Sequence, residues 1–107
     1  RFCSERLTRA ADADGNHPDG LAAQTDQAMR NIIDALVGVG GSTEDLAKLT
    51  IYVVGWTAAM QGELFTGLGA AAQVNPISQV PITLVGVQSL FLDESLIEIE
   101  AVAVLAD

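Results

Sequence analysis

Residues 95–105, SLIEIEAVAVL, decide the fold of this 107-residue chain. Every second residue from Ile97 to Leu105 is apolar, and this two-residue period is typical of a β-strand. One face of the strand is therefore wholly apolar and suited to lie beneath helices. The other face carries Glu98 and Glu100 and then two valines, which is a poor match to open water. We expect a partner subunit to cover that second face, with the two glutamates at the edge of the contact.

The length and composition bound the class of protein. A chain of 107 residues is long enough for one core and too short for two ordinary domains, so residues 1–107 are treated as a single domain. Its 50% hydrophobic and 18% charged content is typical of a globular protein. The longest apolar stretch, residues 51–60, is much shorter than the ~20 residues that span a membrane. We expect no membrane partner.

The charge and the cysteine count exclude further classes. Fourteen acidic against five basic residues give a net charge of −9, which repels polyphosphates, so we expect no nucleic-acid partner. The single cysteine, Cys3, allows no internal disulfide and offers no metal-ligand spacing, so a reducing cytoplasm and no metal are expected. His17 lies alone in a turn-rich loop, where a histidine is usually solvated.

The periodicity predicts six elements in the order β, α, β, α, β, β. In chain order they are a strand at 2–9, a helix at 21–39, a strand at 49–54, a helix at 57–73, a strand at 80–88 and the strand at 95–105. Asp19 is a candidate cap for the first helix, and Gly40-Gly41 can end it in a left-handed turn. Residues 42–45, STED, resemble a capping box.

The order of these elements predicts the topology and the need for a partner. Right-handed crossovers make the first three strands largely parallel, and the last two strands are expected to form a hairpin. Two amphipathic helices can cover only one face of a four-stranded sheet, which predicts an oligomer. Tyr52 alternates with Thr50 and Val54, and it suits either the core or an interface.

Four segments, in the right order, resemble the reactive-intermediate deaminase (Rid or YjgF, endoribonuclease L-PSP-like) family: residues 24–32, 40–53, 83–87 and 97–103. The resemblance implies an α+β, chorismate-mutase-like subunit with a mixed β-sheet and two helices on one face. It also implies a homotrimer with clefts between subunits. Deaminase members of the family add water to reactive enamines or imines of 2-oxo acids, without a metal or an organic cofactor. The family's N-terminal strand is expected to lie before Arg1.

The resemblance also assigns site residues. It places the carboxylate that holds the attacking water on Glu98, as the catalytic residue. The family's substrate-gripping arginine falls on Ile82 or Thr83, and neither can hold a carboxylate bidentately. With Glu100 and Trp56, these two positions are the expected substrate-binding residues. Trp56 has two interpretations, the floor of a small-molecule cleft or an apolar anchor for the second helix.

Two functions remain open. One is a cofactor-free enamine or imine deaminase-like hydrolase that takes altered substrates. The other is a non-catalytic trimer that binds a small ligand or serves in assembly, in which Glu98 and Glu100 form a solvated or ion-paired edge with Lys48, Arg30 or an arginine of a neighbouring subunit. RNA cleavage is disfavoured by the acid excess and by the lack of a His or Lys constellation.

Overall fold

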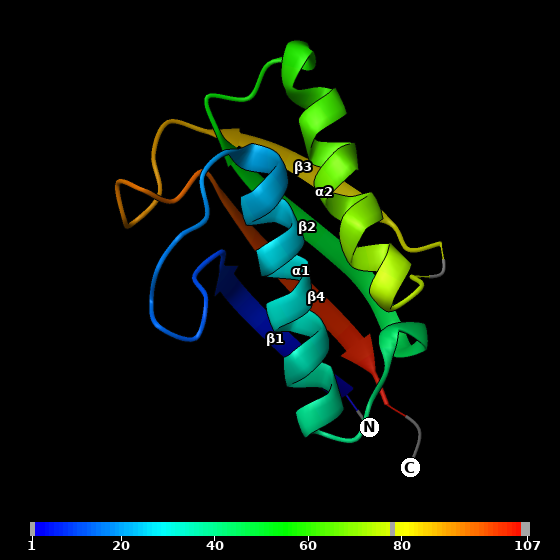
Figure 1. The fold of residues 1–107 in the computed structure, drawn as a ribbon. Coiled ribbons are helices and arrows are strands. Elements are labelled where there is room, and N and C mark those ends of the chain that lie inside the picture. Colours follow the sequence, from blue (N-terminus) through cyan, green and yellow to red (C-terminus); the bar gives the residue numbers. More distant parts are fainter. Residues whose placement is uncertain (1, 78, 106–107) are drawn as a thin grey trace.

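The computed structural model describes residues 2–77 and 79–105, with the backbone alone for residues 2–9. It is an α+β fold, as predicted (Figure 1). The elements are β1 (Phe2–Arg9), α1 (Leu21–Gly38), β2 (Leu46–Val54), α2 (Gln61–Val74), β3 (Ile82–Val87) and β4 (Ile97–Val104), with short 3₁₀ turns at Thr43–Asp45 and Ala58–Met60.

The sheet has the strand order β1-β4-β2-β3. β4 runs antiparallel to both of its neighbours, and β2 runs parallel to β3, so the first three strands share one direction as predicted. The predicted hairpin of the last two strands is wrong, because β4 inserts between β1 and β2 instead of pairing with β3 (Figure 1). In the centre of the sheet, β4 has partners on both sides and its apolar face lies within the core. Segment 88–96 carries the chain from the β3 edge back to this central position.

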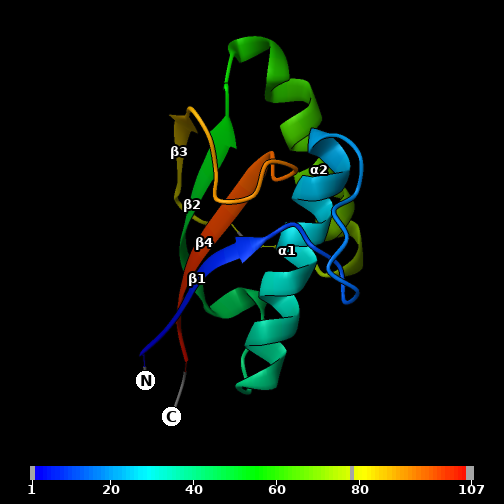
Figure 2. The ribbon, with the colours of Figure 1, turned by 90° about the vertical axis from the view of Figure 1, so that its left-hand side faces the viewer.

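Both helices pack on one face of the sheet, and the opposite face has no helix over it (Figure 2). The register pairs Ile99 with Ile51 and Ile97 with Val53, and all four side chains are fully buried. α1 lies over β4 and β1 and buries a stripe of apolar side chains that includes Met29. The predicted apolar face of residues 97–105 is therefore confirmed as the floor of the core.

The two ends of α1 differ from each other in how well they were predicted. The Asp19 cap is wrong: Gly20 occupies the N-cap with φ 89°, and no side chain caps the helix. The C-terminal turn is confirmed, because Gly40 adopts φ 84° and the Gly41 N–H donates to the Leu36 carbonyl at 2.8 Å. This is a Schellman-type ending, which needs the left-handed backbone that glycine adopts without strain.

The second helix begins later than predicted, because the residues after Thr57 form the Ala58–Met60 turn before α2 starts. α2 meets α1 at Gly67, which is buried. A Cβ at this position would meet the Ala22 carbonyl oxygen and approach Thr25 Cβ to 2.5 Å. Glycine therefore sets the close distance between the two helices. Within the described residues, neither helix has the length and apolar content that a membrane span requires.

Candidate functional site

The helix-free face of the sheet carries the two predicted glutamates. Parallel and antiparallel pairing place Val85, Tyr52 and Glu98 in one row across β3, β2 and β4. The next row holds Thr83, Thr50 and Glu100. Because side chains alternate between the faces of a strand, both rows point away from the helices. We call this surface the bare face; it continues along β4 to Val102 and Val104 and along β2 and β3 to Val54 and Val87.

Glu98 is the unusual residue of the bare face. No helix covers it, yet it is only 8% exposed. It sits in a central strand, with Tyr52 opposite it on β2 and the backbone of Arg9 opposite it on β1. Neighbouring strands therefore shield a carboxyl group from most of the solvent while one side remains accessible from the bare face. Such partly dry carboxyl groups are suited to acid–base chemistry.

Tyr52 links the two glutamates. It pairs with Glu98 in the register, and its hydroxyl donates to Glu100 Oε1 at 3.5 Å, the long limit of a hydrogen bond. The phenol therefore lies on the bare face, which excludes the core alternative for this residue. Sequence reasoning left Tyr52 out of the site, because its pairing with Glu98 depends on the insertion of β4 beside β2.

The structure divides the predicted site residues between the two faces. Glu98, Glu100 and Thr83 share the bare face, whereas Ile82 pairs with Leu49 of the core and so faces the helix side. Of the two positions that could correspond to the family's arginine, Thr83 is the one on the glutamate face. Trp56 packs against the core, where a Cβ on Gly86 would lie 3.2 Å from Trp56 Cβ. This placement matches the interpretation of Trp56 as an apolar anchor.

Arg30, one of the counter-ions considered for the glutamates, has a different partner. Its Nε lies 2.8 Å from Asp26 Oδ1 on the same helix, and α1 is on the other side of the sheet. Lys48 remains on the bare face, at the position paired with Val102. In the described part of the chain, no three His, Cys, Asp or Glu side chains are grouped so that they could hold a metal ion.

A concavity separate from the bare face lies on the helix side, between α2 and the start of β3. It has a volume of about 810 Å³. Its lining is almost entirely apolar and includes Phe65, Leu68, Ile77, Val80 and Ile82. With no acid or base among its lining residues, this groove offers no means of moving a proton. The bare face is therefore the candidate functional site.

The fold and the bare face agree with the comparisons. A family model described as endoribonuclease L-PSP matches residues 8–105. The chain therefore belongs to the endoribonuclease L-PSP family, which includes the Rid and YjgF proteins. No curated protein sequence is significantly similar to it.

Several solved structures share the fold. YyfB from Yersinia pestis, described as a protein of unknown function of the conserved Rid family, is 31% identical with a TM-score of 0.85, over 98% of this chain and 79% of that one. Rv2704 from Mycobacterium tuberculosis is 27% identical with a TM-score of 0.77, over 97% and 79%. TdcF from E. coli, solved with bound serine, is 20% identical with a TM-score of 0.80, over 98% and 80%, and shows the likeness of fold alone.

Proposed function

We propose that this chain forms a homotrimer through its bare face and takes a small metabolite into clefts between the subunits, where Glu98 directs the hydrolysis of an enamine or imine. The observation that carries the proposal is the placement of Glu98: a carboxyl group that is 8% exposed, on a face with no helix, beside the phenol of Tyr52. A second subunit would exclude the remaining water from this position.

The exposed valines of the bare face support assembly. Val104 is 53% exposed, and valines lie on three neighbouring strands of the same surface. Subunit interfaces typically combine an apolar centre with polar groups toward the edge. A partner copy supplies such a covering surface without any other component.

Glu98 can supply both proton transfers of the reaction. In its ionised form it takes a proton from water as the water oxygen attacks the iminium carbon. The resulting carboxyl group then passes that proton to the nitrogen, and the carbon–nitrogen bond breaks as the carbonyl forms and the departing ammonia takes up the hydroxyl proton. Overall, an iminium ion and water give a carbonyl compound and an ammonium ion. The reaction therefore needs a general acid–base and no redox cofactor.

Thr83 sets the expected substrate class. A threonine hydroxyl donates one neutral hydrogen bond, whereas an arginine holds a carboxylate through two charged ones. The substrate is therefore expected to present a neutral polar end to β3 rather than a carboxylate. The serine bound to TdcF supports the use of this fold for small polar ligands.

The alternative is a trimer that binds a small ligand without turning it over. The threonine and isoleucine at the arginine position favour this alternative, because a substrate held without the charged pair is positioned less firmly. Both functions use the same cleft, and they differ in whether ammonia is released.

Ammonia release tests the enzymatic proposal. The substrates are freshly generated 2-aminoacrylate and its uncharged amide, offered to the wild-type chain, Glu98→Gln and Thr83→Arg, with Glu63→Gln on the exposed side of α2 as the matched control. We expect turnover of the amide by the wild type and by Glu63→Gln, and loss of it in Glu98→Gln. Thr83→Arg should raise kcat/KM for the carboxylate substrate about 10- to 100-fold, because one charged hydrogen-bonded pair contributes a factor of this size. Equal rates in wild type and Glu98→Gln would remove Glu98 from the mechanism, and no release by any variant would leave the binding alternative.

A further inference from the structure

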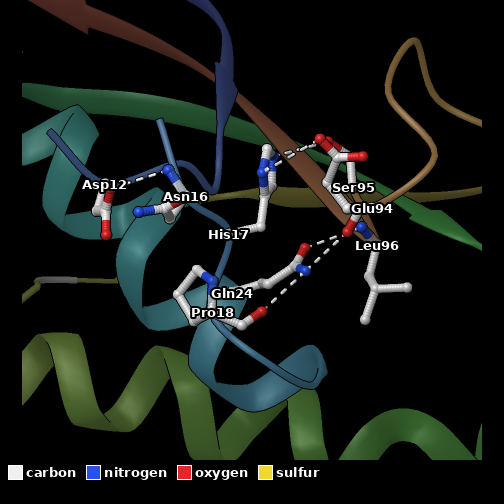
Figure 3. Close-up of polar contacts among 8 residues, drawn as sticks. All are labelled: Asp12, Asn16, His17, Pro18, Gln24, Glu94, Ser95 and Leu96. Atoms are coloured by element: carbon white, nitrogen blue, oxygen red, sulfur yellow. Dashed lines mark hydrogen bonds and ion pairs between the residues drawn. The ribbon is translucent and has the colours of Figure 1, made fainter. Parts of the chain in front are cut away.

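The segment just before β4, Glu94–Leu96, is held by a glutamine side chain from α1. Gln24 lies in the first turn of that helix and is 3% exposed. Its Nε2 donates to the Glu94 carbonyl at 2.9 Å and to the Pro18 carbonyl at 3.1 Å. Its Oε1 accepts from the Leu96 N–H at 2.8 Å. Figure 3 shows the amide reaching across to this segment, which is about 70 residues away in the chain.

The three partners fix the orientation of the Gln24 amide. Both donors face carbonyl oxygens and the acceptor faces an N–H, so a reversed amide would set oxygen against oxygen and nitrogen against N–H. A buried amide with this pattern of partners is specific for glutamine, because a glutamate of the same shape lacks the two donors.

His17 holds the same segment at a second point. Its Nε2 lies 3.0 Å from Ser95 Oγ, and its side chain is 3% exposed. The prediction that His17 is solvated is therefore wrong. The preceding turn closes on itself, with Asp12 Oδ1 accepting from the Asn16 N–H at 2.9 Å, and the chain then directs His17 inward toward Ser95 (Figure 3).

These contacts act at the entry to β4. The Leu96 carbonyl accepts from the Val54 N–H at 3.0 Å, so Leu96 is tied to β2 on one side and to Gln24 on the other. Glu98 follows two residues later, within β4, which begins at Ile97. Because the backbone of a strand is extended, the position of Leu96 constrains the position of the Glu98 backbone, from which the carboxyl group projects.

We propose that Gln24 is a positioning residue for the Glu98 site. Its amide binds the backbone of segment Glu94–Leu96 and so places Glu98 from the helix side of the sheet, without touching the substrate. His17 supports the same segment through Ser95. The catalytic part of this inference rests on the proposed function; the placement of Glu98 does not.

The test uses Gln24→Glu in the full chain, with Gln27→Glu as the matched control. Gln27 lies on the same helix, and its Nε2 donates to Asn31 Oδ1 within α1. Two measurements do not depend on catalytic activity. They are the hydrogen-exchange rate of the Leu96 amide and the ¹³C resonance of the Glu98 carboxyl group. At neutral pH, Gln24→Glu should speed Leu96 exchange about tenfold or more and move the Glu98 resonance, because the ionised carboxylate faces two carbonyl oxygens. Gln27→Glu should leave both unchanged.

The pH dependence separates positioning from general damage. In the folded Gln24→Glu variant, the two carbonyl oxygens disfavour the charged form of the introduced carboxyl group, so its pKa is raised above the value in the unfolded chain. Compared with Gln27→Glu at the same pH, the variant is then expected to regain protection of the Leu96 amide as the pH falls and the carboxyl group becomes a donor. Where ammonia release is measurable, the variant should lower kcat with little change in KM.

Each outcome decides the inference. Unchanged Leu96 exchange and an unchanged Glu98 resonance in Gln24→Glu would overturn it, whether or not the wild type releases ammonia. If Gln24→Glu does not fold, Gln24→Met, which removes the amide donors and acceptor and keeps a side chain of similar length, is measured in its place. A shift of the Glu98 resonance in Gln24→Met supports the inference, and no shift overturns it. If the wild type releases no ammonia but the Glu98 carboxyl resonance shifts in Gln24→Glu, the enzymatic proposal is refuted. The positioning of Glu98 by Gln24 is then still supported.

Discussion

The two faces of β4 have different roles although they alternate along one strand. Ile97, Ile99 and Ala101 point toward the helices and are almost fully buried within a single chain. Glu98 and Glu100, the residues between them, point to the bare face. The covered face is explained by the folding of one chain. The bare face combines exposed valines with a shielded carboxyl group, and the proposed second subunit would cover both.

The comparison separates residues that are buried within one chain from residues on which the proposed function between chains depends. A change on the covered face should lower the stability of the subunit. A change on the bare face should affect assembly or chemistry and leave the fold intact. Substitutions at four positions test this separation, from the largest expected effect to the smallest.

The largest effect is expected for Val104→Asp on the bare face. Burial of an unpaired carboxylate in an apolar contact costs several kcal/mol for each subunit, so the oligomer should dissociate. The side chain is 53% exposed in one chain, so the subunit itself should stay folded. Sedimentation and circular dichroism measure the two properties. An oligomer of unchanged mass would place Val104 outside the interface.

Ile99→Ala on the covered face should lower the free energy of unfolding by about 2–5 kcal/mol, because it opens a cavity beneath the helices. Urea denaturation measures the change, with Val104→Ala as the control on the opposite face. In a variant background that does not assemble, Val104→Ala should cost less than about 1 kcal/mol. Equal losses in the two variants would contradict the separation of the faces.

Gly67→Ala should cost about 1–3 kcal/mol, because the added methyl group has no space between α1 and α2. Gly62 is the matched control on the same helix, since a Cβ there has no neighbour within 4 Å. Gly62→Ala should stabilise the chain by about 0.4–1 kcal/mol. If thermal unfolding showed the same change for both variants, the close approach of the helices at Gly67 would be refuted.

Tyr52→Phe should have the smallest effect on stability. The hydrogen bond to Glu100 is long, at 3.5 Å, so its loss should cost no more than about 0.5 kcal/mol. If the phenol contributes to the cleft, the same variant should change turnover or ligand affinity by a larger factor than it changes stability. A loss of stability well above about 1 kcal/mol would place Tyr52 in the core instead.

Most features that depend on short-range patterns were predicted correctly, and the Asp19 cap is the exception. The alternation of residues 97–105 identified the buried face, and Gly40-Gly41 marked the end of α1. The capping box at residues 42–45 is also confirmed, with the Ser42 N–H donating to Asp45 Oδ2 at 2.9 Å. Each of these features depends on neighbours within a few positions in the chain.

Features that depend on distant pairing were missed. The insertion of β4 between β1 and β2 brings Tyr52 beside Glu98, and no local signal distinguishes this arrangement from a hairpin. The inward turn of His17 depends on Ser95, which is 78 positions away. The glutamates could be singled out from the sequence, but the residues that surround and position them could not.

The most direct test of the central claim is the mass of the wild-type protein in solution at micromolar concentration, by light scattering or sedimentation. We predict a mass three times the 11.2 kDa of one chain, because the proposed assembly is the homotrimer that the family resemblance implies. A stable monomer of 11.2 kDa would contradict both the assembly and the cleft beside Glu98.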